Sequence, residues 1–130
     1  MTPERRWRSV GIVLAIGTVY DLAFAVAILG FTHRAAAILR LTIPDDPVYL
    51  YLNGVFLIVL GALYGAAALA PERYPAIAPI SAGGRVLGFT LFVWAWQGGR
   101  PATFLVLGVA DLLLGLATIV AWQRAARLSD

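Results

Sequence analysis

The sequence predicts an all-α integral membrane protein: a four-helix bundle with a short interfacial helix between its first and second membrane spans. Hydrophobic residues make up 61% of the 130 residues and charged residues 13%, and the mean hydropathy is +0.83. A soluble domain of this size cannot bury so much apolar surface. The chain also contains four long apolar runs, separated by proline, glycine and charged residues, and each is long enough to cross a bilayer.

We expect a single transmembrane domain over residues 1–130, with spans at about 10–30, 48–70, 76–97 and 102–122. The first run is longer than the apolar core of a signal peptide, which is about 7–15 residues, so a polar leader precedes a true span. After this span, apolar residues from Phe31 to Thr42 share one helical face, which predicts a short helix in the headgroup layer. Pro44 and Pro47 are expected to stop that helix, since proline cannot continue it.

The connections between spans predict which helices are neighbours and how the chain is oriented. A tight turn at residues 71–75 predicts that the second and third spans are antiparallel neighbours. If the N-terminus is cytoplasmic, six arginines lie inside and three outside, in keeping with the positive-inside rule. The inner six are Arg5, Arg6, Arg8, Arg73, Arg124 and Arg127, and the outer three are Arg34, Arg40 and Arg100. Both termini are therefore expected in the cytoplasm of a bacterium, with the protein in its inner membrane.

Composition excludes several functional classes. All ten basic residues are arginines, spread over span ends and turns, so the net charge of +3 does not predict a nucleic-acid-binding face. The absence of cysteine removes disulfides, thiolate metal sites and thiol redox chemistry. The single histidine, His33, could ligate haem or a pigment, but no second ligand lies near it in the sequence. No metal and no cofactor is predicted.

Three charged residues deep within apolar spans form the candidate site. Arg85 lies about nine residues into the third span, and Asp21 and Asp111 lie deep in the first and fourth. At ~1.5 Å of rise per residue, all three are roughly 14–18 Å from the cytoplasmic ends of their helices. Because an unpaired charge at this depth is costly, we predict one buried polar cluster of Asp21, Arg85 and Asp111. A structural role is the first interpretation, and a proton-coupled or ligand-binding site is the alternative.

Aromatic and small residues accompany this cluster. Residues that share helical faces with it and could line a ligand cleft are Tyr20, Asn53, Tyr64, Phe89, Phe92 and Trp96. The competing interpretation is helix packing together with an interfacial aromatic belt. Two small-residue patterns, Gly61-x-x-x-Gly65 and Gly84-x-x-x-Gly88, predict that other helices approach closely.

The middle third of the chain resembles a known group of proteins. The run Asn53-Gly54, Gly61-x-x-Tyr64, Pro71-x-Arg73-Tyr74 and Gly83-Gly84-Arg85 is similar to uncharacterised small bacterial four-helix membrane proteins that are loosely DoxX-like. The resemblance implies a four-helix membrane fold. It also implies an association with quinone-linked and redox membrane complexes.

These patterns favour a non-catalytic protein, because no nucleophile–base pair, metal-ligand cluster or phosphate loop can be recognised. We expect an accessory or assembly subunit of a larger membrane complex, with the lipid bilayer and other membrane subunits as partners. Contact with quinone, lipid or pigment is left open. The alternative is a small proton-coupled transporter or a membrane protein that binds a lipophilic ligand. Small multidrug transporters also have four short helices and an acidic residue in the first.

Overall fold

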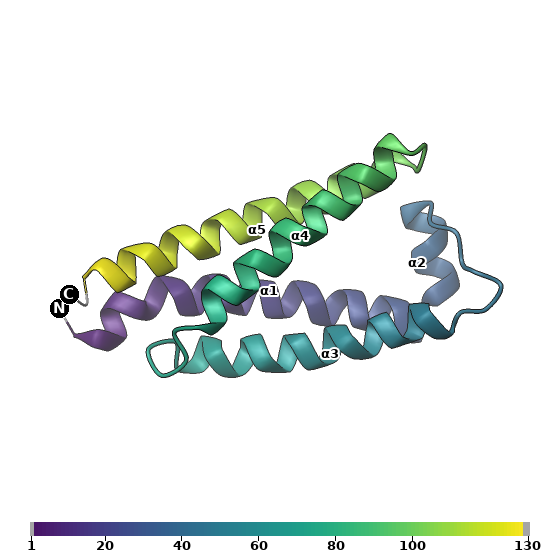
Figure 1. Ribbon diagram of the computed structural model, residues 1–130. Helices are drawn as coiled ribbons and strands as arrows, with labels where there is room; N and C mark the ends of the chain where they lie inside the picture. The colour runs from purple at the N-terminus through teal and green to yellow at the C-terminus, as the bar shows by residue number, and fades with distance from the viewer. Residues whose placement is uncertain (1, 129–130) are drawn as a thin grey trace.

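The computed structural model describes residues 2–128, and most of these residues are helical. They form five helices, shown in Figure 1: α1 (Pro3–Gly30), α2 (Thr32–Leu39), α3 (Val48–Leu69), α4 (Ile77–Gln97) and α5 (Ala102–Arg127). The predicted all-α fold, with a short helix between the first two spans, is confirmed. All helices except α2 are long and apolar enough to cross a membrane. The chain is therefore a multi-pass membrane protein.

The helix α1 begins before the first predicted span, because the polar leader is itself helical. The Thr2 hydroxyl accepts a hydrogen bond from the Arg5 amide (3.4 Å), Pro3 occupies the first turn, and Glu4 lies near the positive end of the helix dipole. At ~1.5 Å per residue, the 28 residues of α1 extend roughly 42 Å, more than the ~30 Å of hydrocarbon in a bilayer. Its first turns therefore project beyond the apolar layer and carry arginines with them.

The interfacial helix α2 ends earlier than the sequence predicts. We expected Pro44 and Pro47 to stop it, but α2 ends at Leu39. Arg40 adopts the left-handed conformation (φ 54°, ψ 41°), and the Leu41 amide donates a hydrogen bond back to the Ala36 carbonyl (2.9 Å). This pattern closes a helix through its own backbone, without proline. The prolines shape the following loop instead.

The four long helices pack as two pairs. α3 lies along α1, α4 lies along α5, and contacts between α1 and α5 join the pairs. The prediction that the second and third spans are neighbours was wrong, since α3 and α4 touch only sparsely and diverge from their shared turn (Figure 1). The small residues of these two spans pack against other helices instead: Leu22 of α1 packs on Gly61, and Asp111 of α5 packs on Gly88. A short turn brings two helix ends together, but it does not determine which helices pack against each other along their length.

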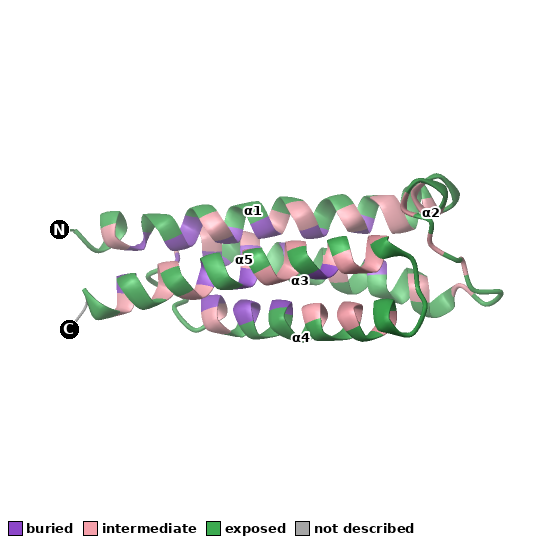
Figure 2. Cartoon of the chain, turned by 90° about the horizontal axis from the view of Figure 1, so that it is seen from above, coloured by how far each residue is buried: buried purple, intermediate pink, exposed green. Residues whose placement is uncertain are grey.

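The two ends of the bundle differ. Near the termini, a dry core draws on all four long helices and contains Trp7, Val10, Leu14, Ala67, Ala78 and Ala125. We call this the closed end, and we call the opposite end, where α2 lies, the open end. On α4 every buried residue lies in the half near the closed end, as Figure 2 illustrates. Both ends of the described chain lie at the closed end, as an even number of spans requires (Figure 1). The cytoplasmic location of the termini stays a prediction.

Candidate functional site

Arg85 is the centre of the candidate site and the last buried residue of α4 counted from the closed end. Only 9% of its surface is exposed. Its Nη1 donates to Asp21 Oδ1 (2.8 Å) and its Nη2 to Asp21 Oδ2 (3.0 Å). This two-pronged contact matches the planar guanidinium to the planar carboxylate, the strongest geometry for such a pair. It ties α4 to α1, which belong to different helix pairs.

Asp111 of α5 completes the cluster. Arg85 Nη1 donates a second hydrogen bond to Asp111 Oδ1 (3.1 Å), and Nη2 donates to the Gly17 carbonyl (3.3 Å). Asp111 is the more accessible acid, with 13% of its side chain exposed against 3% for Asp21. With all three groups ionised, the cluster carries one net negative charge. The structure thus brings together the three residues that the sequence singles out.

Glycines make room for the cluster on every side. A Cβ atom at Gly17 would lie 3.0 Å from Arg85 Nη2, and one at Gly115 would lie 3.0 Å from Arg85 Cβ. A Cβ at Gly88 would lie 2.9 Å from Asp111 Oδ2. A side chain at any of these positions would force its neighbour to shift, so the glycines let the helices approach closely around the ion pairs.

Two tyrosines place their rings near the guanidinium. Arg85 Cζ lies 5.4 Å from the ring centroid of Tyr20 on α1 and 6.0 Å from that of Tyr64 on α3. Both distances fall within the range of cation–π attraction, which is stronger where water is excluded. Through Tyr64 the cluster also reaches α3, so every long helix contributes to it.

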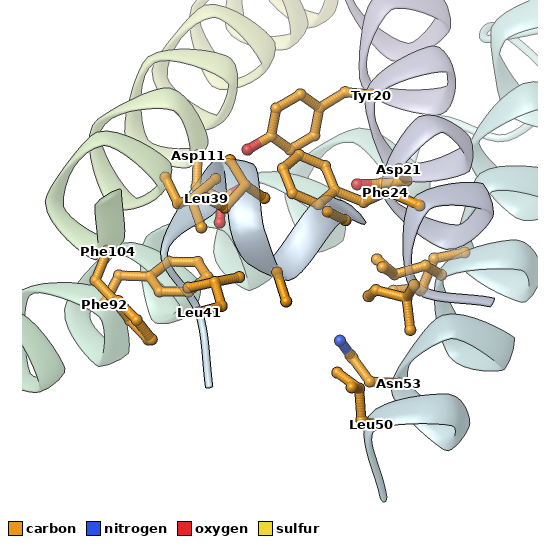
Figure 3. A pocket seen from close by; sticks show the side chains of 18 of the residues that line it. Tyr20, Asp21, Phe24, Leu39, Leu41, Leu50, Asn53, Phe92, Phe104 and Asp111 are labelled. Carbon is orange, nitrogen blue, oxygen red and sulfur yellow. The ribbon is translucent and has the colours of Figure 1, made fainter. Parts of the chain in front are cut away.

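A cavity of about 560 Å³ extends from the cluster toward the open end. Its floor is formed by Asp21, Arg85 and Asp111, and its walls are mostly aliphatic and aromatic. Leu50 and Asn53 of α3 lie across from Phe92 of α4 and Phe104 of α5, and Leu39 and Leu41 from α2 and its loop lie between the two sides (Figure 3). The interfacial helix α2 therefore forms part of the cavity wall.

The predicted cleft residues divide into two sets. Tyr20, Asn53, Tyr64 and Phe92 line the cavity, whereas Phe89 and Trp96 lie outside its lining. Phe89 packs against Gly108 of α5, which the Cβ of Phe92 also contacts, and Trp96 is 40% exposed on the outer surface. The aromatic residues of α4 therefore differ in what they contact: the cavity, α5 or the surroundings of the protein.

Sequence reasoning missed Phe24 and Phe104. The Phe24 ring lies 4.9 Å from that of Tyr20, and the Phe104 ring lies 6.0 Å from that of Phe92. Phe24 follows Tyr20 by one helical turn, so its position was a usable signal. Phe104 carried no such signal, because its role depends on how α5 packs along α4.

The site offers few side chains that could bind a metal ion. Among the described residues, no group of three or more His, Cys, Asp or Glu side chains is arranged to hold a metal ion. His33 is exposed on α2 and is not among the cavity-lining residues. What the site offers is a polar floor with one accessible carboxylate beneath an apolar chamber.

Comparison with protein-family models, curated proteins and solved structures gives no match for this chain. The DoxX-like resemblance therefore stays a prediction. The fold and the site define the class, a multi-pass membrane protein with a buried Asp–Arg–Asp cluster at the floor of an apolar cavity.

Proposed function

We propose that this protein binds a lipophilic molecule in the cavity, with a hydrogen-bond-donating or cationic head group at Asp111. The observation that carries the proposal is a chamber of about 560 Å³ with apolar walls and a charged floor. Ligand sites commonly have roughly this volume and this lining, with apolar walls and a few convergent polar groups. An empty chamber would leave many apolar side chains without packing partners, which favours an apolar occupant.

The polarity of the head group follows from the hydrogen bonds at the floor. Each Nη atom of Arg85 already makes two hydrogen bonds, so neither Nη atom has a donor left for a ligand. Asp111 Oδ2, in contrast, accepts no hydrogen bond from the described residues. At Asp111, this free carboxylate oxygen favours a head group that donates a hydrogen bond, such as an amine, a quinol or a hydroxyl-bearing lipid.

The accessory-subunit interpretation stays a prediction. The Gly61-x-x-x-Gly65 and Gly84-x-x-x-Gly88 patterns would serve that interpretation if a helix of another protein packed on them. In the structure, Gly61 and Gly65 lie against Leu22 and Thr18 of α1, and Gly88 lies against Asp111. Those faces are largely occupied within the chain, so the geometry supports ligand binding better than docking. The alternative is a transporter that uses the same cavity. It requires that the ligand crosses the membrane and that its transport depends on Asp21 or Asp111.

Two adjacent glycines allow a matched test. Neither Gly83 nor Gly84 has an atom within 4 Å of its hypothetical Cβ, yet Gly84 lines the cavity and Gly83 does not. Gly84→Leu should therefore place its side chain in the cavity with no clash at Cβ, and Gly83→Leu should add the same side chain elsewhere. Both changes favour the helix by up to about 1 kcal/mol, so neither should reduce stability.

The measurement is binding of dodecylamine to the purified chain in lipid nanodiscs, by calorimetry, with empty nanodiscs as the blank. We expect Gly84→Leu to abolish saturable binding and Gly83→Leu to preserve it. Asp111→Asn should weaken binding about tenfold, because it removes a charge-assisted hydrogen bond. Equal binding by all variants would refute the site, and equal binding of decylubiquinone and its quinol would refute the assignment of a donor head group.

A further inference from the structure

A second cavity, separate from the first, lies between α1 and α5 at the closed end. It has a volume of about 530 Å³ and is lined by polar residues of α1 and by one face of α5. Arg5, Arg6 and Ser9 contribute from α1, and Arg124 contributes from the last turn of α5. Leu116 and Val120 extend the lining along α5 toward the middle of the span. We call this cavity the basic groove.

The charged residues that line the basic groove are all arginines. Glu4 lies in the same first turn of α1 but is not part of the lining. Arg6 is held in place because its Nη1 donates to the Leu128 carbonyl (2.7 Å). Its Nε is buried and has no hydrogen-bond partner in the part of the chain that the structure describes. Because this atom has almost no exposed surface, a ligand in the groove would meet mainly the exposed guanidinium groups of Arg5 and Arg124.

We propose that the basic groove binds the phosphate of an anionic phospholipid, with the acyl chains along Leu116 and Val120. The lining has the polarity of such a molecule: arginines where the helices leave the apolar layer, and aliphatic side chains one to two turns deeper. Basic pockets between membrane-spanning helices bind acidic head groups in this way. A free phosphate ion would use the arginines but would leave the aliphatic part uncovered. The proposal does not depend on what occupies the cavity at the open end.

The chain supplies a matched control for the arginines. Arg5 and Arg124 line the groove, whereas Arg8 and Arg127 lie close by on the same two helices and do not. All four side chains are exposed, and replacing them leaves the contact between Arg6 and Leu128 in place. Arg5→Gln with Arg124→Gln and Arg8→Gln with Arg127→Gln therefore remove equal charge from the same end of the bundle.

The test is titration of the purified full chain with phosphatidylglycerol and with phosphatidylcholine of the same acyl chains, read by native mass spectrometry. We expect tighter binding of phosphatidylglycerol. Each groove arginine removed should weaken that binding about fivefold. The control pair should change it by about twofold at most, since exposed charges outside the site are largely screened.

Several results would overturn the proposal. Equal losses in the groove pair and the control pair would show a general basic surface and no site. Equal affinity for the two lipids would remove the role of the acidic head group. Inorganic phosphate that displaces phosphatidylglycerol at equal concentration would show that the acyl chains contribute nothing, so the site would belong to a free anion.

Discussion

The closed end and the open end of the bundle are built from the same helices but pack in opposite ways. At the closed end, small residues let the backbones meet: a Cβ at Gly11 would lie only 2.8 Å from the Ala68 carbonyl oxygen. At the open end, large aromatic and aliphatic side chains surround a chamber of about 560 Å³. The Asp21–Arg85–Asp111 cluster lies between the two, where the dry core ends and the cavity begins.

This difference shows how a small membrane protein combines rigidity with space for a ligand. Without a hydrophobic driving force between helices in lipid, association relies on close packing and polar contacts. The closed end supplies the close packing, and the cluster supplies the polar contacts between the two helix pairs. Because the closed end and the cluster hold the two helix pairs together, the helices need not pack closely at the open end, and a cavity can exist there.

The largest effect is expected from Arg85→Leu. This change would strand two carboxylates inside the bundle, and breaking a buried ion pair typically costs about 3–5 kcal/mol. It would also separate the helix pairs at the point where they diverge. The measurement is the free energy of unfolding in mixed micelles.

The triple variant Arg85→Leu, Asp21→Asn and Asp111→Asn sharpens this test. Because it removes the stranded charges as well, it should recover a substantial part of the stability lost by Arg85→Leu alone. Purely additive losses of unfolding free energy would mean that the three residues do not act as a unit. The cluster would then not mark the boundary between the closed end and the open end.

A smaller effect is expected from Gly11→Ala at the closed end. The added methyl group would meet the Ala68 backbone carbonyl, which cannot move aside as a side chain can. We expect a loss of roughly 1–3 kcal/mol, the usual cost of overpacking. Gly83→Ala is the matched control, because its Cβ meets no atom within 4 Å and the change favours the helix. Similar unfolding free energies for the two variants would contradict the tight packing of the closed end.

The fold was largely predictable from the sequence, but the pairing of the helices was not. Length and hydropathy identify each span, because the bilayer sets how many apolar residues a helix needs. The position of α4 against α5 depends on side chains far apart in the sequence, such as Asp111 on Gly88. The end of α2 also escaped prediction, because a non-glycine residue, Arg40, adopts the left-handed conformation that closes it.

The cluster could be predicted and the cavity only in part. Charges are so rare inside these spans that Asp21, Arg85 and Asp111 have few alternatives to one another as partners. For the aromatic residues, a shared helical face does not determine which of them line the cavity. Phe89 and Phe92 lie on one face of α4 and both contact Gly108 of α5, yet only Phe92 also lines the cavity. Only the crossing of α4 with α5 separates their roles.

The divergence of α3 from α4 is the central claim, and spin-label distances test it most directly. The chain has no cysteine, so labels can be attached at introduced cysteines without background. One pair, Ala66→Cys and Ile80→Cys, lies near the turn between α3 and α4. The other pair, Tyr51→Cys and Trp94→Cys, lies at the open end of the same helices. All four positions are exposed.

The measurement is the distance between the two spin labels of each pair, by pulsed electron–electron double resonance in lipid nanodiscs. Diverging helices predict a clearly longer distance between the labels at Tyr51 and Trp94 than between those at Ala66 and Ile80. Equal distances would mean that α3 and α4 run side by side along their whole length. That result would leave no space for the cavity between the helix pairs and would contradict the account.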